Sequence, residues 1–475
     1  MRKNHLVASS PVDARSLYRA VWRWHFYAGL LVLPFLIWLA VTGALFVFNK
    51  DIDGYLYREL KTVPAVITPV PSHEAVLTAA LAAHPGTVFR YTPPATPTSS
   101  AEVGVVNASG VRWVVFVNPH TVRVLGAMPD RSSLSWTIRR LHSLKYFSPV
   151  ARGAIEIAAG WAILLVLTGT YLWWPRGRSG GVVTVRGQVR QRLFWRDLHA
   201  VTGLGVGAAV LFLAFTGMPW SVFLGDKVNQ LANGQNFGYP TGVRVAVPMS
   251  DQRLRDAGPT SWSLEQAQLP QSGHAGHDEH AGHPAAGASQ VQGALRLDAA
   301  IAIFERLGIA KGYTVNPPKG LTGVYTASVY PNAVADQLVI HLDQYSGKPL
   351  IDMRYADYGW LGRWLEWGIN IHLGQEFGVP NQLALVGVCL ATVLLCVSAA
   401  VMWWKRRPAG SLGVPPLPAD RRVLRGVAGL LVIGGLVFPL VGVSFVVMWV
   451  VDAWAFRARP PQTTVWRVDG EKRLL

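Results

Sequence analysis

The sequence predicts a polytopic α-helical membrane protein with five spans, built from a duplicated unit, with two small α+β domains outside the membrane. Three observations predict this class. Of the 475 residues, 51% are hydrophobic and only 15% are charged, a composition typical of membrane proteins. Apolar stretches of the ~20 residues that a helix needs to cross a bilayer recur along the chain. The third observation is an internal repeat of histidines, which indicates a duplicated unit.

Four histidines hold equivalent places in the two halves of the chain. His25 and His199 are each followed after 17 residues by a Thr-Gly pair, and His142 and His372 are each followed after 31 residues by a Trp-Trp pair. These pairs are Thr42-Gly43, Thr216-Gly217, Trp173-Trp174 and Trp403-Trp404. Because an ionisable side chain in a membrane is costly unless it is paired, histidines repeated in this way are expected to serve a function.

Positive charge orients the spans. Arginines and lysines gather before the first span, between the second and third, and between the fourth and fifth, and such segments face the cytoplasm. The net charge of +17 is mostly this bias, so the expected partner is the lipid bilayer and no nucleic acid. The first span is too long for a signal-peptide core and is expected to anchor the chain in a bacterial inner membrane.

The predicted organisation follows from these spans. In chain order, the expected segments are a cytoplasmic N-terminus (1–24), the first span (25–48), a periplasmic domain (49–141), a periplasmic leader with the second span (142–174), a cytoplasmic loop (175–198), the third span (199–223), a periplasmic insert (224–293), a second periplasmic domain (294–360), a leader with the fourth span (361–404), a cytoplasmic loop (405–425), the fifth span (426–450) and a periplasmic tail (451–475).

Each external domain is expected to combine one helix with several short strands. Residues 72–84 have the pattern of an amphipathic helix with a Ser N-cap, and residues 298–307 have a similar helical pattern. Strands separated by turns follow in both halves. They are expected at 88–91, 103–106, 113–117 and 122–125 in the first domain, and at 323–330, 337–342 and 349–353 in the second.

The insert in the second external segment carries a histidine-rich tract. Its histidines recur every third residue beside Asp278 and Glu279, and they are His274, His277, His280 and His283. Imidazoles and carboxylates at this density can hold divalent metals such as Cu(II), Ni(II) or Zn(II). Glycine and alanine between them argue against a rigid site, which leaves a flexible metal-capturing loop and an idle linker as the two interpretations.

Several motifs resemble the PepSY-associated transmembrane proteins over about residues 20–410. They are the turns Asn118-Pro-His-Thr121 and Asp343-Gln-Tyr-Ser-Gly347 after a helix and strands, and the segments Leu141-His142-Ser143, Thr168 to Arg176 and Arg196-Asp197-Leu198-His199. That family includes inner-membrane ferrisiderophore reductases. The resemblance implies PepSY-like external domains and haem-dependent electron transfer to iron complexes in the periplasm.

The predicted topology sorts the four histidines into two layers. His25 and His199 begin spans at the cytoplasmic edge, whereas His142 and His372 precede spans at the periplasmic edge. Two facing imidazoles can ligate one b-type haem without the Cys-x-x-Cys-His motif of covalent attachment, and the sequence has no such motif. Together with the resemblance, this implies two non-covalent, bis-His haems. The alternative is that the histidines are satisfied residues of helix interfaces.

Glycines and arginines near the histidines complete the expected cofactor sites. Gly29 and Gly203 each lie four residues after a histidine and are expected either to let a flat macrocycle approach or to serve helix packing. Arg139 and Arg196 are expected to pair with haem propionates, unless they are topology signals. No catalytic side chain beyond the haem ligands is expected.

The expected function is the reduction of a ferric siderophore, or of another periplasmic metal chelate, from Fe(III) to Fe(II). The sequence contains no nucleotide-binding glycine motif after a strand, so electrons are expected from quinol or from a cytoplasmic reductase. Two alternatives stay open. One is a non-catalytic membrane anchor that displays two PepSY domains for binding or regulation, and the other is a metal permease that uses the histidine-rich loop for capture.

Overall fold

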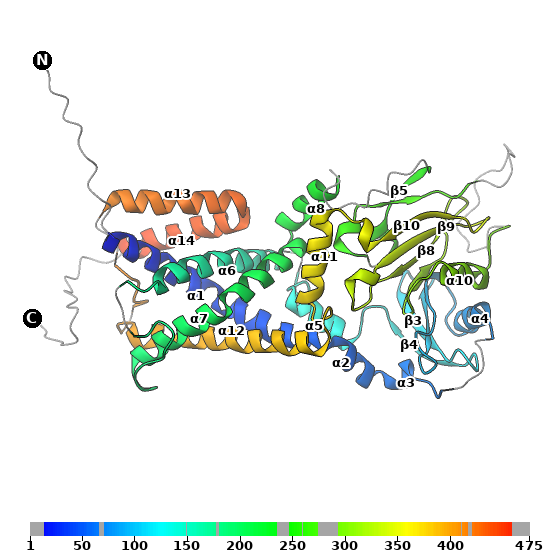
Figure 1. The fold of residues 1–475 in the computed structure, drawn as a ribbon, viewed down its shortest axis with the longest axis horizontal. Coiled ribbons are helices and arrows are strands. Elements are labelled where there is room, and N and C mark those ends of the chain that lie inside the picture. Colours follow the sequence, from blue (N-terminus) through cyan, green and yellow to red (C-terminus); the bar gives the residue numbers. More distant parts are fainter. Residues whose placement is uncertain are drawn as a thin grey trace, which may run out of the picture.

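The molecule has two parts, a bundle of long helices and a domain built on a β-sheet (Figure 1). The computed structural model describes residues 14–65, 71–148, 150–176, 180–234, 247–258, 260–273, 293–409, 411–416 and 420–457. We call the end of the bundle that meets the β-strands the sheet end, and the opposite end, at which the first helix begins, the loop end.

Four helices of the bundle are long and apolar enough to cross a membrane. They are α1 (Ala14–Val47), α6 (Arg152–Trp173), α7 (Arg192–Gly217), which continues into η1 (Met218–Trp220), and α12 (Val379–Arg406). The shortest, α6, has 22 residues and extends about 33 Å, which exceeds the ~30 Å of the hydrocarbon layer. The first four predicted spans are therefore confirmed as helices of sufficient length.

The predicted fifth span, 426–450, is wrong, because the chain forms a helical hairpin there. α13 (Arg421–Val437) and α14 (Pro439–Arg457) lie side by side and run in opposite directions (Figure 1). The ring of Pro439 cannot continue the preceding helix, and a Cβ on Gly435 would lie 2.7 Å from Cα of Gly442, so only glycine permits this close approach. α14 ends at the loop end, where α13 begins (Figure 1). Between residues 425 and 457 the chain therefore does not cross from one end of the bundle to the other, as the predicted tail at 451–475 required. Residues 458–475 of that tail lie outside the described residues.

Two short helices lie where the bundle meets the sheet domain. α5 (Leu134–His142) and α11 (Trp360–His372) each end at one of the repeated histidines. The chain then turns through residues with positive φ, at Leu144 (53°) after α5 and at Gly374 (75°) and Gly378 (61°) after α11. The leaders before α6 and α12 are therefore separate helices, and α11 crosses the direction of the bundle (Figure 1).

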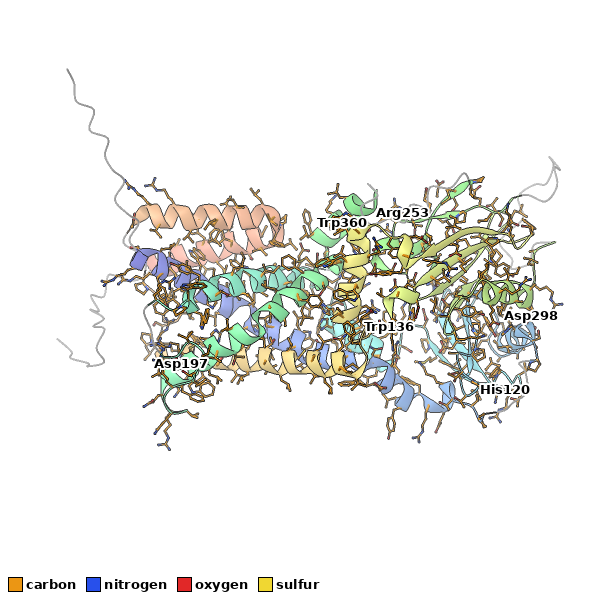
Figure 2. The ribbon with its side chains drawn as sticks, viewed as in Figure 1. His120, Trp136, Asp197, Arg253, Asp298 and Trp360 are labelled. Atoms are coloured by element: carbon orange, nitrogen blue, oxygen red, sulfur yellow. The ribbon has the colours of Figure 1, made fainter. Side chains whose placement is uncertain are left out.

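Exposed tryptophans on α11 mark the level at which the bundle meets the sheet domain. Trp360, Trp364 and Trp367 follow one another at helical spacing and are 70%, 53% and 39% exposed. Figure 2 labels Trp360 on α11 and Trp136 on α5 at this level. Exposed tryptophan is typical of a membrane–water interface, so this level is expected to coincide with the bilayer surface.

The two predicted external domains form one continuous antiparallel sheet. Its strand order is β10-β9-β8-β7-β1-β2-β3-β4, and the two halves join where Tyr91 of β1 pairs with Val315 of β7. Strand β7 was not predicted because its three residues are too few to show an alternating pattern. The strands are β1 (Thr87–Thr92), β2 (Ala101–Val106), β3 (Arg112–Val117), β4 (Val124–Pro129), β7 (Thr314–Asn316), β8 (Val324–Val329), β9 (Leu338–Asp343) and β10 (Pro349–Arg354).

Two helices cover one face of this sheet and cap one another. α4 (His73–Ala83) and α10 (Leu297–Arg306), both predicted, share one hydrophobic core with both halves of the sheet. The Glu74 carboxylate accepts the Leu297 N–H at 2.6 Å, and Asp298 (Figure 2) accepts the Ser72 hydroxyl and the His73 N–H, both at 2.6 Å. The first N–H groups of a helix have no partner within it, so these reciprocal carboxylates link the two halves.

Part of the insert packs on the other face of the sheet. β5 (Met249–Arg253) pairs with β6 (Gln268–Pro270), and Leu264 and Leu269 lie in one cluster with Val339 of the sheet. The Glu366 carboxyl of α11 accepts the Ser263 N–H at 2.7 Å, and burial raises the pKa of Glu366 to about 7. The insert is thereby tied to the helix that carries His372. The predicted histidine-rich tract lies outside the described residues.

Short helices connect these parts. They are α2 (Asn49–Leu56), α3 (Arg58–Lys61), α8 (Leu224–Gly234), α9 (Leu254–Ala257), η3 (Trp262–Leu264), η4 (Val334–Asp336) and η5 (Tyr355–Asp357).

Candidate functional site

The structure brings His25 of α1 next to His199 of α7. Their ring centroids are 6.5 Å apart, and the ring planes meet at 85°. Each histidine lies in the half of its helix that is nearer the loop end. Two histidines separated by more than a third of the sequence are therefore neighbours within the bundle.

Each of the four repeated histidines has a hydrogen bond between Nδ1 and a hydroxyl group of another helix. The pairs are His25 with Thr168 (2.9 Å), His142 with Thr42 (2.9 Å), His372 with Thr216 (2.8 Å) and His199 with Ser398 (3.2 Å). His199 Nδ1 also lies 3.1 Å from the carbonyl oxygen of Leu395.

These hydroxyl groups determine the tautomer of the histidines. Each hydroxyl donates its proton to a carbonyl one turn earlier in its own helix; the donors and acceptors are Thr42 and Trp38 (2.6 Å), Thr168 and Leu164 (2.7 Å), Thr216 and Phe212 (2.7 Å), and Ser398 and Leu395 (2.8 Å). A hydroxyl has only one proton, so its oxygen accepts the N–H at Nδ1 of the histidine. The lone pair of each neutral ring is then on Nε2, and metal-ligating histidines are oriented in the same way by a bond at the other nitrogen.

Glycines make room for three of these imidazoles. A Cβ on Gly43, Gly169 or Gly217 would lie 3.3–3.4 Å from Cε1 of a histidine, and the pairs are Gly43 with His142, Gly169 with His25 and Gly217 with His372. Each glycine directly follows the threonine that binds the same ring. The Thr-Gly pair of the repeat is thus one unit that binds Nδ1 and leaves space for the ring.

Gly29 and Gly203, the glycines predicted from the sequence, do not face the histidines. An added Cβ would lie 4.0 Å from Leu165 at Gly29 and 3.4 Å from Leu395 at Gly203. The reason is that helix side chains tilt toward the N-terminus, so a histidine ring points away from the residue four positions later. Each of the two glycines faces a leucine of a neighbouring helix, a contact that agrees with the helix-packing alternative.

His142 and His372 share a second neighbourhood at the sheet end. The hydroxyl groups that bind them, on Thr42 and Thr216, lie in the last two turns of α1 and α7. Burial lowers the pKa of His372, and the nearby imidazole of His142 lowers that pKa further. The four histidines therefore form two groups, one toward each end of the bundle.

The first pair leaves room for one metal between its rings. A metal–imidazole bond is about 2.0–2.1 Å long, and the ring centroids of His25 and His199 are 6.5 Å apart. The Nε2 atoms of these two histidines would hold the metal. Among the described residues, no group of three or more His, Cys, Asp or Glu is placed to hold a metal ion.

The two arginines predicted for haem propionates differ in their surroundings. Arg196 lies 2.6 Å from the buried carboxylate of Asp197 (Figure 2), which also binds Arg186 at 2.8 Å. Arg139 is exposed, and its guanidinium lies 5.0 Å from the centroid of the Trp136 ring. Arg196 is thus occupied by a carboxylate, whereas Arg139 keeps its charge available for an anionic group near His142.

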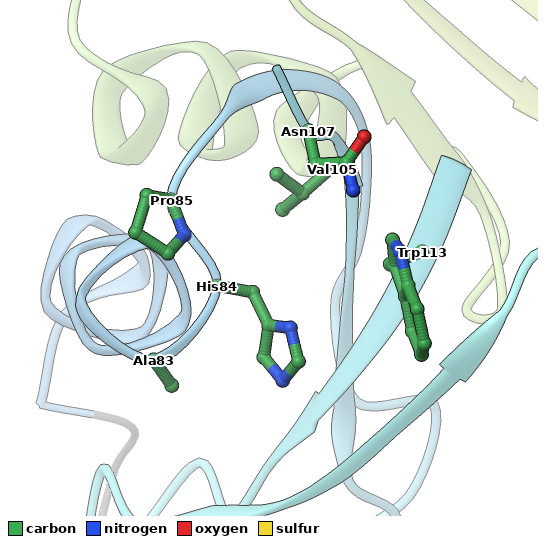
Figure 3. Close-up of a pocket in the computed structure, with 6 residues that line it drawn as sticks. All are labelled: Ala83, His84, Pro85, Val105, Asn107 and Trp113. Carbon is green, nitrogen blue, oxygen red and sulfur yellow. The ribbon is translucent and has the colours of Figure 1, made fainter. Parts of the chain in front are cut away.

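A small cleft lies at the outer end of the sheet domain, away from the four repeated histidines of the bundle. It has a volume of about 220 Å³ and is lined by Ala83, His84, Pro85, Val105, Asn107 and Trp113. The rings of His84 and Trp113 stack with centroids 5.7 Å apart, and Figure 3 shows both side chains facing the cleft. Its position beside the end of α4 separates it from the bundle, so it does not belong to the histidine sites.

The hydroxyl partners are the site residues that sequence reasoning missed. The repeat contained a signal for them, because Thr168 and Ser398 each lie 26 residues after an equivalent histidine, His142 or His372. The first half has threonine at this position and the second half has serine. Both side chains have a hydroxyl group, so the hydroxyl oxygen is the feature that the two halves share.

The comparison with known protein families agrees with this architecture. The family model of the PepSY-associated TM region matches residues 22–406, a range that runs from α1 to the end of α12 and includes all four histidines. No curated protein matches the sequence. Because the matched range covers most of the chain, the protein belongs to the PepSY-associated transmembrane family.

Proposed function

We propose that the protein carries electrons across a bacterial inner membrane through two b-type haems and reduces a ferric chelate in the periplasm. The observation that carries this proposal is the pair of His25 and His199, whose rings are 6.5 Å apart and whose Nδ1 atoms are both bound by other helices. A bound haem supplies one-electron chemistry between Fe(III) and Fe(II). In the overall reaction, quinol or a cytoplasmic reductase loses each electron, and the iron of a siderophore or other chelate gains it and becomes Fe(II).

The residues of the chain hold and orient the cofactors in this proposal. His25 and His199 hold one haem toward the loop end, and His142 and His372 hold the other at the sheet end. The hydroxyl partners keep each ring in one orientation and make Nε2 a better ligand. We infer that the loop end faces the cytoplasm, because the arginine-rich segments of the sequence lie there.

Two haems per chain are the expected result of direct quantification. Purified protein is assayed by the pyridine haemochrome method against protein mass, and its reduced spectrum is expected to show the α-band of a six-coordinate b-type haem. A ratio of one would contradict the two-site proposal. A colourless protein would instead support the alternative of a non-catalytic anchor that displays the PepSY-like sheet.

The metal-permease alternative has weaker support than the electron-transfer proposal, because the bundle offers few carboxylates to bind a metal ion along a transport path. Glu156 is the main carboxylate within the predicted spans, and it is buried. It accepts the N–H groups of Phe223 at 2.9 Å and Leu224 at 3.1 Å. This carboxylate therefore caps the start of α8, and its oxygens are already occupied by backbone donors.

Replacing Thr168 with valine is expected to weaken the haem site at the loop end. Valine has the shape of threonine but cannot accept the Nδ1–H of His25, so the ring loses the bond that orients it. Loss of such a partner lowers metal affinity about 10–100-fold. The measurement is a titration of the haem-free protein with haem, followed by the Soret band.

The matched control for this variant is Thr170→Val. The Thr170 hydroxyl also donates to a carbonyl one turn earlier, that of Val166 at 2.8 Å, and among the described contacts it has no histidine beside it. Haem affinity is expected to stay unchanged in the control. Equal losses in both variants would contradict the proposed role of the Thr168 hydroxyl.

A further inference from the structure

A group of cationic side chains surrounds α5 at the sheet end of the bundle. Residues 131–152 contain five cationic side chains and neither aspartate nor glutamate. We call these residues the α5 cationic patch: Arg131, Arg139, Arg140, Lys145 and Arg152. Four of them are exposed, and Arg152 is half-buried. Figure 2 marks their location by Trp136, which lies on the same helix.

The cations of the patch lie close enough to repel one another. The pKa of Lys145 is lowered, first by partial burial and then by Arg152, Arg131, Arg139 and Arg140. A cluster of like charges is unfavourable unless an opposite charge compensates it. The patch therefore carries a net positive charge at the surface beside His142.

The side chains of the patch contact aromatic rings and a backbone carbonyl. The Arg152 guanidinium donates to the carbonyl oxygen of Trp220 at 2.7 Å. The guanidinium of Arg131 lies 5.2 Å from the centroid of Trp136, and that of Arg140 lies 5.3 Å from the centroid of Tyr146.

The Asp130 carboxylate lies 3.7 Å from Arg131 and already binds Arg90 at 3.2 Å. Glu265 lies within electrostatic range of Arg152, and the Asp53 carboxylate accepts the Ser135 N–H of α5. Within the described residues, the other four cations have no ion pair with a carboxylate.

The location of the patch excludes a role in membrane topology. Excess lysine and arginine orient a membrane protein from the cytoplasmic side, and the segments with that excess, 175–198 and 405–425, lie at the loop end. The patch lies at the opposite end of the bundle. It is also absent from the second half of the chain, where residues 360–379 hold Arg363 together with Glu366 and Glu376.

We propose that the α5 cationic patch is the docking surface for an anionic ferric chelate, an inference that rests on the proposed function. Arg139 and Arg140 lie three and two residues before His142 on α5, and Lys145 lies three residues after it, so an anion bound there lies beside the sheet-end histidines. Carboxylate or catecholate groups around Fe(III) leave a chelate with net negative charge, which the guanidinium and ammonium groups match. The chelate gains one electron on reduction, its iron changes from Fe(III) to Fe(II), and no bond to the protein forms.

The test measures how fast reduced full-length protein is oxidised by two chelates of different charge. The protein is reconstituted in nanodiscs of zwitterionic lipid and mixed by stopped flow with ferric citrate, which is anionic, or with a neutral ferric tris-hydroxamate. The variant Arg140→Gln/Lys145→Gln leaves Arg139 for the haem propionates. Arg363→Gln is the matched control, an exposed arginine at the same end of the bundle.

The expected result is selective loss of the reaction with the anionic chelate. Electrostatic steering changes association rates by about 10- to 1000-fold, and this effect falls with ionic strength. The double variant should therefore react with ferric citrate at least about 10-fold more slowly at low salt. Its rate with the neutral chelate and both rates of Arg363→Gln should equal those of the wild type.

Three outcomes would overturn the proposal. The first is an unchanged rate with ferric citrate, and the second is an equal loss with both chelates. The third is an effect that appears only when the nanodiscs contain anionic lipid, which would assign the patch to lipid headgroups.

A failure of the proposed function can be distinguished from a failure of this inference. If the wild-type protein binds no haem or reduces neither chelate, docking is measured by calorimetry with gallium citrate, which has the same charge and is not reduced. Weaker binding in the double variant would then support the docking surface without the redox reaction. Equal binding in both proteins would overturn it.

Discussion

Alanine at His25 or at His199 is expected to remove the same haem, and alanine at His142 or His372 is expected to remove the other. The reason is that His25 and His199 are neighbours with a ring separation of 6.5 Å, whereas His142 and His372 lie together at the sheet end. Each single variant should lower the haem content from two per chain to one, or convert one low-spin iron to a five-coordinate high-spin form. Haemochrome quantification and EPR of the four variants measure this effect.

The control for this series is His84→Ala, because His84 lies in the sheet domain and stacks on Trp113. Its haem content and EPR signals should match those of the wild type. If His25→Ala and His142→Ala changed the same EPR signal, the pairing proposed from the structure would be wrong.

Alanine at His142 is also expected to stop the reduction of an external chelate while the loop-end haem can still be reduced. His142 lies on α5 at the sheet end, and its ring is bound to Thr42 near the end of α1. Its loss should remove the proposed exit site for electrons and leave the pair of His25 and His199 intact. Stopped-flow reoxidation of prereduced protein in oriented proteoliposomes measures the transfer.

The variant Thr170→Val serves as the control here too, since its hydroxyl contacts only a backbone carbonyl among the described contacts. It should be reoxidised by external chelate at the wild-type rate. Reoxidation of His142→Ala at that same rate would show that the sheet-end histidines are not the exit, and the proposal of a transmembrane conduit would fail.

The sequence repeat contained most of the information about the histidine sites. Equal spacing from histidine to Thr-Gly in both halves identified His25 and His199 as equivalent, and the structure makes them neighbours. The role of the Thr-Gly pair could not be predicted, because Thr42 binds a histidine that lies 100 positions away. Contact between two helices depends on how they pack, and spacing along one helix does not report it.

The fifth span and the separate external domains were also predicted from local patterns, and in both cases contacts between distant residues changed the result. Apolar residues on both sides of Pro439 look like one span, and only the close approach of Gly435 to Gly442 reveals a hairpin. The separate α+β domains were predicted from strands that are each visible locally. The junction of the sheet depends on a single pair, Tyr91 with Val315, across more than 200 residues of sequence.

Sequence patterns were enough to predict the membrane class, the four long spans, the helices and most strands of the outer domain, and the equivalence of the four histidines. These features depend on hydrophobic periodicity and on spacing within one element, which a linear sequence reports directly. Which groups contact one another was visible only in the folded molecule. It paired each histidine with a hydroxyl, it placed Gly43, Gly169 and Gly217 beside the rings in place of Gly29 and Gly203, and it joined two sheets into one. Packing brings such groups together across long stretches of chain, so the pattern within one helix or strand does not report which groups will be in contact.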